Sequence, residues 1–128
     1  MHVSRNALAG VLMSLDENFV RAIYDELFEE NFNRYKEVLN QPIDDGKDSF
    51  ARARNALALL DETERSHVIN FFKVVMFDSA SVILGTLDGV HFPDDLDGDF
   101  LLLCDDKEIQ GSLADIFIGK AQDAGVYE

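Results

Sequence analysis

The stretch VINFFKVVMFDSASVILGTL, residues 68–87, is an almost continuous apolar run and decides the fold. Asp61 and Glu64 precede it at the spacing of a capping box, which predicts a helix from about residue 62 to residue 87. A helix that is apolar nearly all round is typically a buried central helix. Polar residues interrupt the run, among them Lys73, Asp78, Ser79 and Ser81. These interruptions argue against a membrane span.

The residues before this run predict further helices. Ser14 and Glu17 have the spacing of a second capping box, which opens a long helix with one apolar face. The pair Gln41-Pro42 ends that helix near Asn40, because a residue that precedes proline avoids the α region. Three shorter segments complete this half: a helix over 5–13, a loop over 41–48 and a helix over 49–60.

After the run, the spacing of apolar residues changes from that of a helix to that of strands. FLLLC, residues 100–104, predicts a strand, and EIQ, residues 108–110, predicts its partner after a turn at 105–107. Ser112 is placed to cap a last helix over residues 113–122. We expect the final six residues to be frayed.

Length and composition complete the fold prediction. A chain of 128 residues, 47% apolar, can form one domain over residues 1–128 without a disulfide or metal. We expect a mainly α (α+β) fold, with three to four helices around the central apolar helix, a C-terminal β-hairpin and a short terminal helix. The single Cys104 and the absence of a signal-peptide pattern predict a cytoplasmic protein.

The charge is strongly negative, at −14, and residues 88–128 carry two basic and eleven acidic residues. Such a surface repels phosphate backbones and anionic lipids, so we expect no nucleic-acid or membrane partner. It favours encounter with a basic protein, although acidity also serves solubility alone.

The segment LDGVHFPDDLDGDF, residues 87–100, has five aspartates and suggests a calcium loop. An EF-hand loop with Gly98 at its sixth position would put Pro93 at the first position and Cys104 at the twelfth. Neither residue offers the required carboxylate. The Asp-Gly pairs are typical of turns, so we interpret the segment as an acidic turn without a metal.

No pattern predicts catalysis. Glu64 and His67 form one Glu-x-x-His pair, whereas a di-iron bundle needs two copies of it. Cys104 lies beside acidic residues, which raise a thiol pKa, so we interpret it as a core residue. No nucleophile elbow or phosphate-binding glycine loop occurs. We therefore expect no enzyme activity, metal or cofactor.

The first long helix has like-charge pairs at four-residue spacing, which weakly destabilise a helix. They are typical of a solvated face, and the alternative is an acidic patch that serves a partner. With the aspartate segment and one apolar residue, these acids make up the predicted partner-binding set: Asp25, Glu26, Glu29, Glu30, Phe77, Asp94, Asp95, Asp97 and Asp99. Phe77 is either covered by the C-terminal segment or lines a contact surface.

Two stretches, FFKVVMFDSASVILGTLDG and DFLLLCDDKEIQGSLADIF, make residues 60–120 resemble small acidic uncharacterised bacterial proteins. Proteins of this type occur as integron gene-cassette products and as immunity proteins beside toxin genes. The immunity resemblance implies a protein that binds and blocks a toxin, and it assigns no site residues.

The function expected from the sequence is therefore a non-enzymatic acidic protein-binding module, of the immunity, inhibitor or mobile-cassette accessory type. The acidic faces would steer a basic partner, and an apolar centre at Phe77 or the hairpin would supply affinity. The alternative is a small-molecule-binding domain with a Phe-lined pocket. Homodimerisation through the hairpin or the central helix is compatible with both.

Overall fold

The computed structural model describes residues 14–128, so the helix expected over 5–13 lies outside the described residues. The chain forms two compact units. One is Asp25–Met76, and the other joins the residues up to Tyr24 with Phe77–Glu128. The predicted fold class is confirmed: the described chain is mainly helical, with a C-terminal hairpin and a short terminal helix.

The elements follow the predicted order. They are α2 (Leu15–Asp25), the π-helical segment η1 (Glu26–Asn31), α3 (Phe32–Leu39), α4 (Ser49–Leu57), α5 (Glu62–Asp88), β1 (Leu103–Cys104), β2 (Lys107–Glu108) and α6 (Leu113–Asp123). The first three are continuous in the chain and together make the long first helix, which ends before Asn40 as predicted. The π-helical turns within it were not predicted.

The start of α5 confirms its capping box. The Glu64 N–H donates to Asp61 Oδ1 at 2.8 Å, and the Asp61 N–H donates to Glu64 Oε1 at 3.1 Å. The hydrogen bond from Glu64 lowers the pKa of Asp61. At the start of α2 the reciprocal box is not formed, because the Ser14 hydroxyl donates to the Glu17 carboxylate at 3.0 Å. The Ser14 carbonyl still accepts the first helical N–H, from Asn18.

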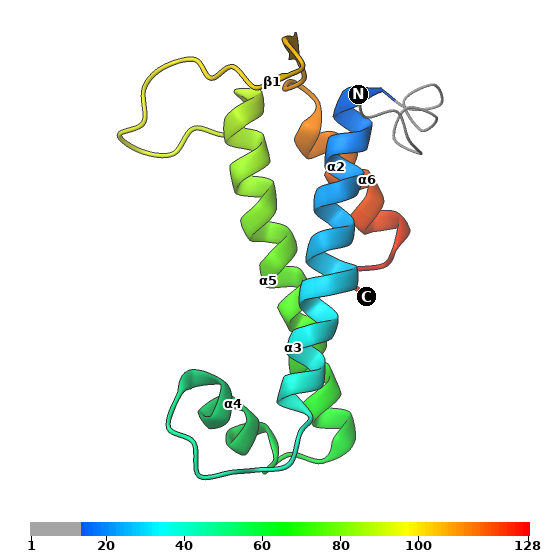
Figure 1. The fold of residues 1–128 in the computed structure, drawn as a ribbon, viewed down its shortest axis with the longest axis vertical. Coiled ribbons are helices and arrows are strands. Elements are labelled where there is room, and N and C mark those ends of the chain that lie inside the picture. Colours follow the sequence, from blue (N-terminus) through cyan, green and yellow to red (C-terminus); the bar gives the residue numbers. More distant parts are fainter. Residues whose placement is uncertain (1–13) are drawn as a thin grey trace. The chain divides into compact units, whose positions relative to one another are not determined.

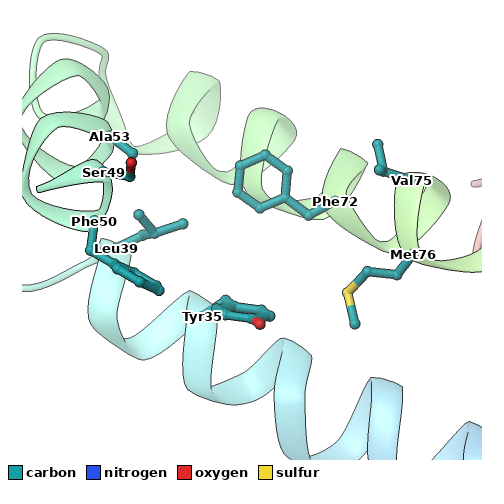
Figure 2. Close-up of a pocket in the computed structure, with 8 residues that line it drawn as sticks. All are labelled: Tyr35, Leu39, Ser49, Phe50, Ala53, Phe72, Val75 and Met76. Atoms are coloured by element: carbon teal, nitrogen blue, oxygen red, sulfur yellow. The ribbon is translucent and has the colours of Figure 1, made fainter. Parts of the chain in front are cut away.

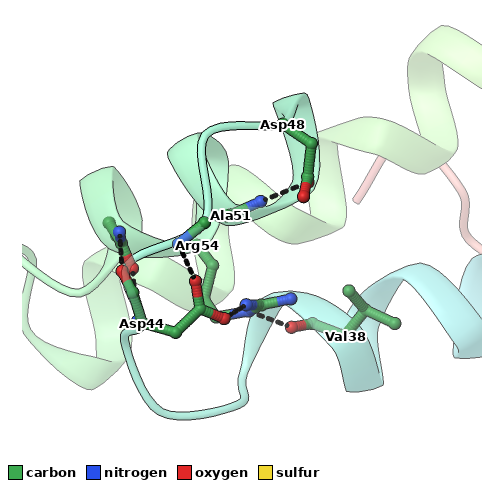
Figure 3. Close-up of polar contacts among 7 residues, drawn as sticks. Val38, Asp44, Asp48, Ala51 and Arg54 are labelled. Carbon is green, nitrogen blue, oxygen red and sulfur yellow. Dashed lines mark hydrogen bonds and ion pairs between the residues drawn. The ribbon is translucent and has the colours of Figure 1, made fainter.

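The core of the unit Asp25–Met76 lies among α3, α4 and α5. Its buried side chains are Phe32, Leu39, Leu57 and Ile69, with Ala53, Leu60, Phe72 and Met76 packed against them. Arg54 is also buried, at 8% exposed, and forms an ion pair with Asp44 (Figure 3). Its Nε donates to the Val38 carbonyl at 2.9 Å. Arg54 therefore neutralises a nearby carboxylate from a buried position.

The core of the other unit is built around Phe117 on α6. Phe77 stacks on its ring, with centroids 5.2 Å apart, and Tyr24 meets it edge-on at 5.9 Å. The ring of Tyr127 meets the ring of Phe77 edge-on, with centroids 5.2 Å apart. The hydroxyl of Tyr127 donates a hydrogen bond to Asp78. The C-terminal residues are therefore packed rather than frayed, and Val126 beside Tyr127 is buried.

The prediction that α5 is buried on nearly all sides is wrong. Several of its large apolar side chains are substantially exposed: Val68, Phe71, Val75, Val82 and Ile83. Sequence periodicity counts apolar residues around a helix, but it does not say how many neighbours are present to cover them. By length and composition alone, α5 is also the one helix of residues 14–128 that could cross a membrane, a property it shares with long core helices of soluble proteins.

The hairpin is shorter than predicted. Leu103 pairs with Glu108 and Cys104 pairs with Lys107, so each strand has two residues and the turn is Asp105-Asp106. Cys104 is half-buried on β1 and is not part of the buried core.

Candidate functional site

The candidate site is residues 90–103, which connect α5 to the hairpin and which we call the acidic segment. It forms a wide excursion, coloured yellow in Figure 1, before the chain returns to β1. It begins where Gly89 ends α5 with a φ of +75°. The Gly89 N–H bonds the Thr86 carbonyl at 3.1 Å, and the Val90 N–H bonds the Gly85 carbonyl at 2.9 Å. These two bonds form a Schellman motif, which turns the chain away from the helix.

The other end of the acidic segment is held by the side chain of Gln110. Its Nε2 donates to the Phe100 carbonyl at 2.9 Å, and its Oε1 accepts the Leu102 N–H at 2.9 Å. The Leu102 carbonyl in turn accepts the Ile109 N–H at 3.0 Å. A side-chain amide therefore extends the short hairpin and fixes the base of the segment, so the intervening residues project from two anchored ends.

Six large apolar side chains of the acidic segment are exposed to between 42% and 77%: Val90, Phe92, Leu96, Phe100, Leu101 and Leu103. Exposed apolar residues scattered singly over a surface are ordinary. A concentration of them in fourteen consecutive residues is unusual, and Phe92, Leu96 and Phe100 line one pocket. Contiguous apolar surface commonly marks an interaction site. Leu103 lies on β1 of the hairpin, where we expected an apolar contact from the sequence.

The predicted aspartates of the segment, Asp94, Asp95, Asp97 and Asp99, are all exposed. Asp94 and Asp95 lie in a turn in which the Leu96 N–H donates to the Pro93 carbonyl at 3.3 Å. The segment contains no Lys or Arg, so its apolar side chains lie in a uniformly acidic setting. Within residues 14–128 no three His, Cys, Asp or Glu side chains converge to hold a metal ion.

The other predicted acids, Asp25, Glu26, Glu29 and Glu30, are exposed on α2 and η1. They belong to the unit Asp25–Met76, whereas the acidic segment belongs to the other unit. η1 is π-helical, with i→i+5 hydrogen bonds, so these acids do not lie on one continuous α-helix as the sequence predicted.

Phe77 is not an accessible anchor, because it is 5% exposed and packs between Phe117 and Tyr127. Phe77 was expected either to be covered by the C-terminal segment or to line a contact surface, and the C-terminal segment covers it. The hydroxyl of Tyr127 is bonded to Asp78, and desolvation and this carboxylate raise the pKa of Tyr127 to about 12.

Sequence reasoning missed Phe92 and Phe100 as candidate contact residues. The available signal was their position: each lies within two residues of an aspartate or proline, in a stretch rich in turns. A large aromatic residue in such a stretch has few neighbours close in the chain that could bury it. Glu64, half of the Glu-x-x-His pair, serves the cap of α5, as we interpreted it from sequence.

Comparisons of the chain with protein-family models, with curated proteins and with solved structures gave no significant match.

Proposed function

We propose that this protein is a non-enzymatic binding module that contacts a basic protein partner through the acidic segment. The observation that carries the proposal is the combination, in residues 90–103, of six exposed apolar side chains with four exposed aspartates and no Lys or Arg. Protein interfaces commonly combine an apolar centre with a charged rim that speeds encounter. An immunity protein or inhibitor that blocks a basic toxin is the instance favoured by the resemblance of the sequence.

In this proposal the apolar side chains supply affinity and the aspartates raise the rate of association. Aromatic residues supply most of the affinity in typical interfaces, and Phe92, at 77% exposed, is the foremost candidate. The aspartates raise the rate of association with a basic surface, and salt screens this effect over about 10 Å at 0.1 M ionic strength. The proposal therefore requires an association rate that falls steeply with salt.

The test uses two variants that remove the same number of carboxylates. The segment variant carries Asp94→Asn, Asp95→Asn, Asp97→Asn and Asp99→Asn. The helix variant carries Asp25→Asn, Glu26→Gln, Glu29→Gln and Glu30→Gln. Immobilised wild type and both variants are incubated with a cell lysate at low and high salt, and retained proteins are identified by mass spectrometry.

We expect a basic protein that wild type and the helix variant retain at low salt and that the segment variant loses. The single variant Phe92→Ser should also lose it, whereas Leu59→Ser, at a highly exposed position of the other unit, should not. Retention by the segment variant, or retention that is unaffected by salt, would overturn the proposal. Loss by the helix variant alone would assign the binding surface to α2 and η1.

A further inference from the structure

The unit Asp25–Met76 contains a pocket of about 320 Å³ that the proposed function does not use (Figure 2). Its eight lining residues come from three helices: Tyr35 and Leu39 from α3, Ser49, Phe50 and Ala53 from α4, and Phe72, Val75 and Met76 from α5. Four of them, Leu39, Ala53, Phe72 and Met76, also belong to the core cluster of this unit. The floor of the pocket is therefore the ordered core itself, and its shape does not depend on a loop.

All eight side chains that line the pocket are uncharged. The only side-chain polar atoms among the eight residues are the hydroxyls of Tyr35 and Ser49. Lys73 follows Phe72 in the chain, but its ammonium group lies 4.7 Å from the centroid of the Phe32 ring and it is not a lining residue. A charged ligand would lose its hydration here and gain no opposite charge, which is unfavourable.

Two of the aromatic residues that line the pocket contact each other. The rings of Tyr35 and Phe50 are stacked, with centroids 6.2 Å apart and planes 23° from parallel. In Figure 2 the ring of Phe72 comes from α5, opposite Tyr35, and Met76 lies beside it. Offset stacking between aromatic rings is favourable, and a thioether adapts its shape to an adjacent ring. This arrangement suits a planar apolar ligand.

The size of the pocket fits a small molecule. Ligand pockets typically measure about 300–1,000 Å³, and the volume of about 320 Å³ lies within that range. A second copy of this chain would in addition bring a further net charge of −14 to the contact. We infer that this pocket binds an uncharged small molecule with an aromatic ring, independently of the partner proposed for the acidic segment.

The test uses N-phenyl-1-naphthylamine, an uncharged aromatic probe whose fluorescence rises in an apolar site. Val75→Asp places a carboxylate at the rim of the pocket, where Val75 is 50% exposed, so the variant can fold. Val68→Asp is the matched control, because Val68 lies on the same helix, is 40% exposed and does not line the pocket. Ala53→Leu fills the pocket without adding charge.

We expect wild type to bind the probe, Val75→Asp to weaken binding by about tenfold or more, and Val68→Asp to change it by less than about twofold. Ala53→Leu should also weaken binding, and thermal unfolding should show that all three variants are folded. Phe92→Ser should leave binding unchanged, which excludes the acidic segment as the probe site.

Absence of probe binding to wild type, or equal weakening by Val68→Asp and Val75→Asp, would overturn the inference. So would sedimentation showing a wild-type dimer that Val75→Asp dissociates, because a second copy would then occupy the pocket. Loss of probe binding has no bearing on partner capture through the acidic segment. Either proposal, the pocket ligand or the basic protein partner, can therefore be overturned while the other stands.

Discussion

The carboxylate of Asp88 accepts the backbone N–H of Ala114 at 2.8 Å, across 26 positions of the chain. Its other oxygen accepts the N–H groups of Gly111, at 2.6 Å, and Leu113, at 3.1 Å. The last residue of α5 thereby caps the start of α6. Ser112, which the sequence predicted as the cap, makes no side-chain capping bond, so that prediction is wrong. A carboxylate at this position also interacts favourably with the helix dipole.

Asp88→Ala should lower the free energy of unfolding by about 1–2 kcal/mol, the usual cost of losing a helix cap. Three backbone N–H groups lose their acceptor at once, and Leu113 and Ala114 are buried. Urea unfolding of the variant measures this loss. Asp94→Ala, an exposed aspartate of the acidic segment, is the control and should change stability by less than about 0.5 kcal/mol. Equal losses in both variants would contradict the capping role.

Tyr127 should titrate near pH 12, because its pKa is raised from 10.0 to about 12 by desolvation and by the Asp78 carboxylate. Ultraviolet absorbance of tyrosinate measures this, and the component near pH 12 should disappear in Tyr127→Phe. A raised pKa means that the folded state favours the protonated phenol. The stability it contributes is thus fully present below pH 10 and is lost as the pH rises toward about 12.

Tyr127→Phe should therefore show a shallower loss of stability between about pH 10 and pH 12 than wild type. If the two proteins lose stability in parallel over this range, the Tyr127 phenol is not linked to folding.

Asp106→Gly should stabilise the hairpin. Asp105 and Asp106 form its two-residue turn with φ angles of +51° and +64°. Such left-handed conformations cost a residue with a Cβ roughly 1–2 kcal/mol, whereas glycine adopts them freely, and Asp-Gly is a preferred sequence for this turn. We expect a gain of about 0.5–1 kcal/mol in the free energy of unfolding, measured in urea.

Asp97→Gly serves as the control for this substitution, because Asp97 is not among the residues with positive φ. It should leave stability unchanged or lower it slightly, because glycine raises the entropy of the unfolded chain. A gain as large as that of Asp106→Gly would show that turn geometry is not the cause.

Arg54→Ala should lower the free energy of unfolding by about 2–3 kcal/mol, because it removes a buried guanidinium bonded to Asp44 and to the Val38 carbonyl. The Asp44 side chain is 50% exposed and can return to water, which limits the loss. Arg52→Ala, two residues earlier on the exposed face of α4, should cost less than about 0.5 kcal/mol. Thermal or urea unfolding distinguishes the two, and similar losses would contradict a structural role for the ion pair.

The candidate site was predictable only in part. The aspartates of residues 94–99 were identified by composition, because charge is a local property of the sequence. Their apolar neighbours were not, since the exposure of Phe92 depends on which elements happen to cover it. The sequence left two alternatives open for Phe77 for the same reason: its burial is decided by Phe117 and Tyr127, which lie far along the chain.

What the sequence determined by itself is local. It set the helical fold class, the capping box of Asp61 and Glu64, and the limits of α5, because caps and periodicity act over a few residues. Only the tertiary structure decided the cap of α6 by Asp88, the docking of Tyr127 and the exposure of α5. Each of these depends on contacts between residues distant in the chain or on the number of neighbours present. No local pattern of residue types specifies either quantity.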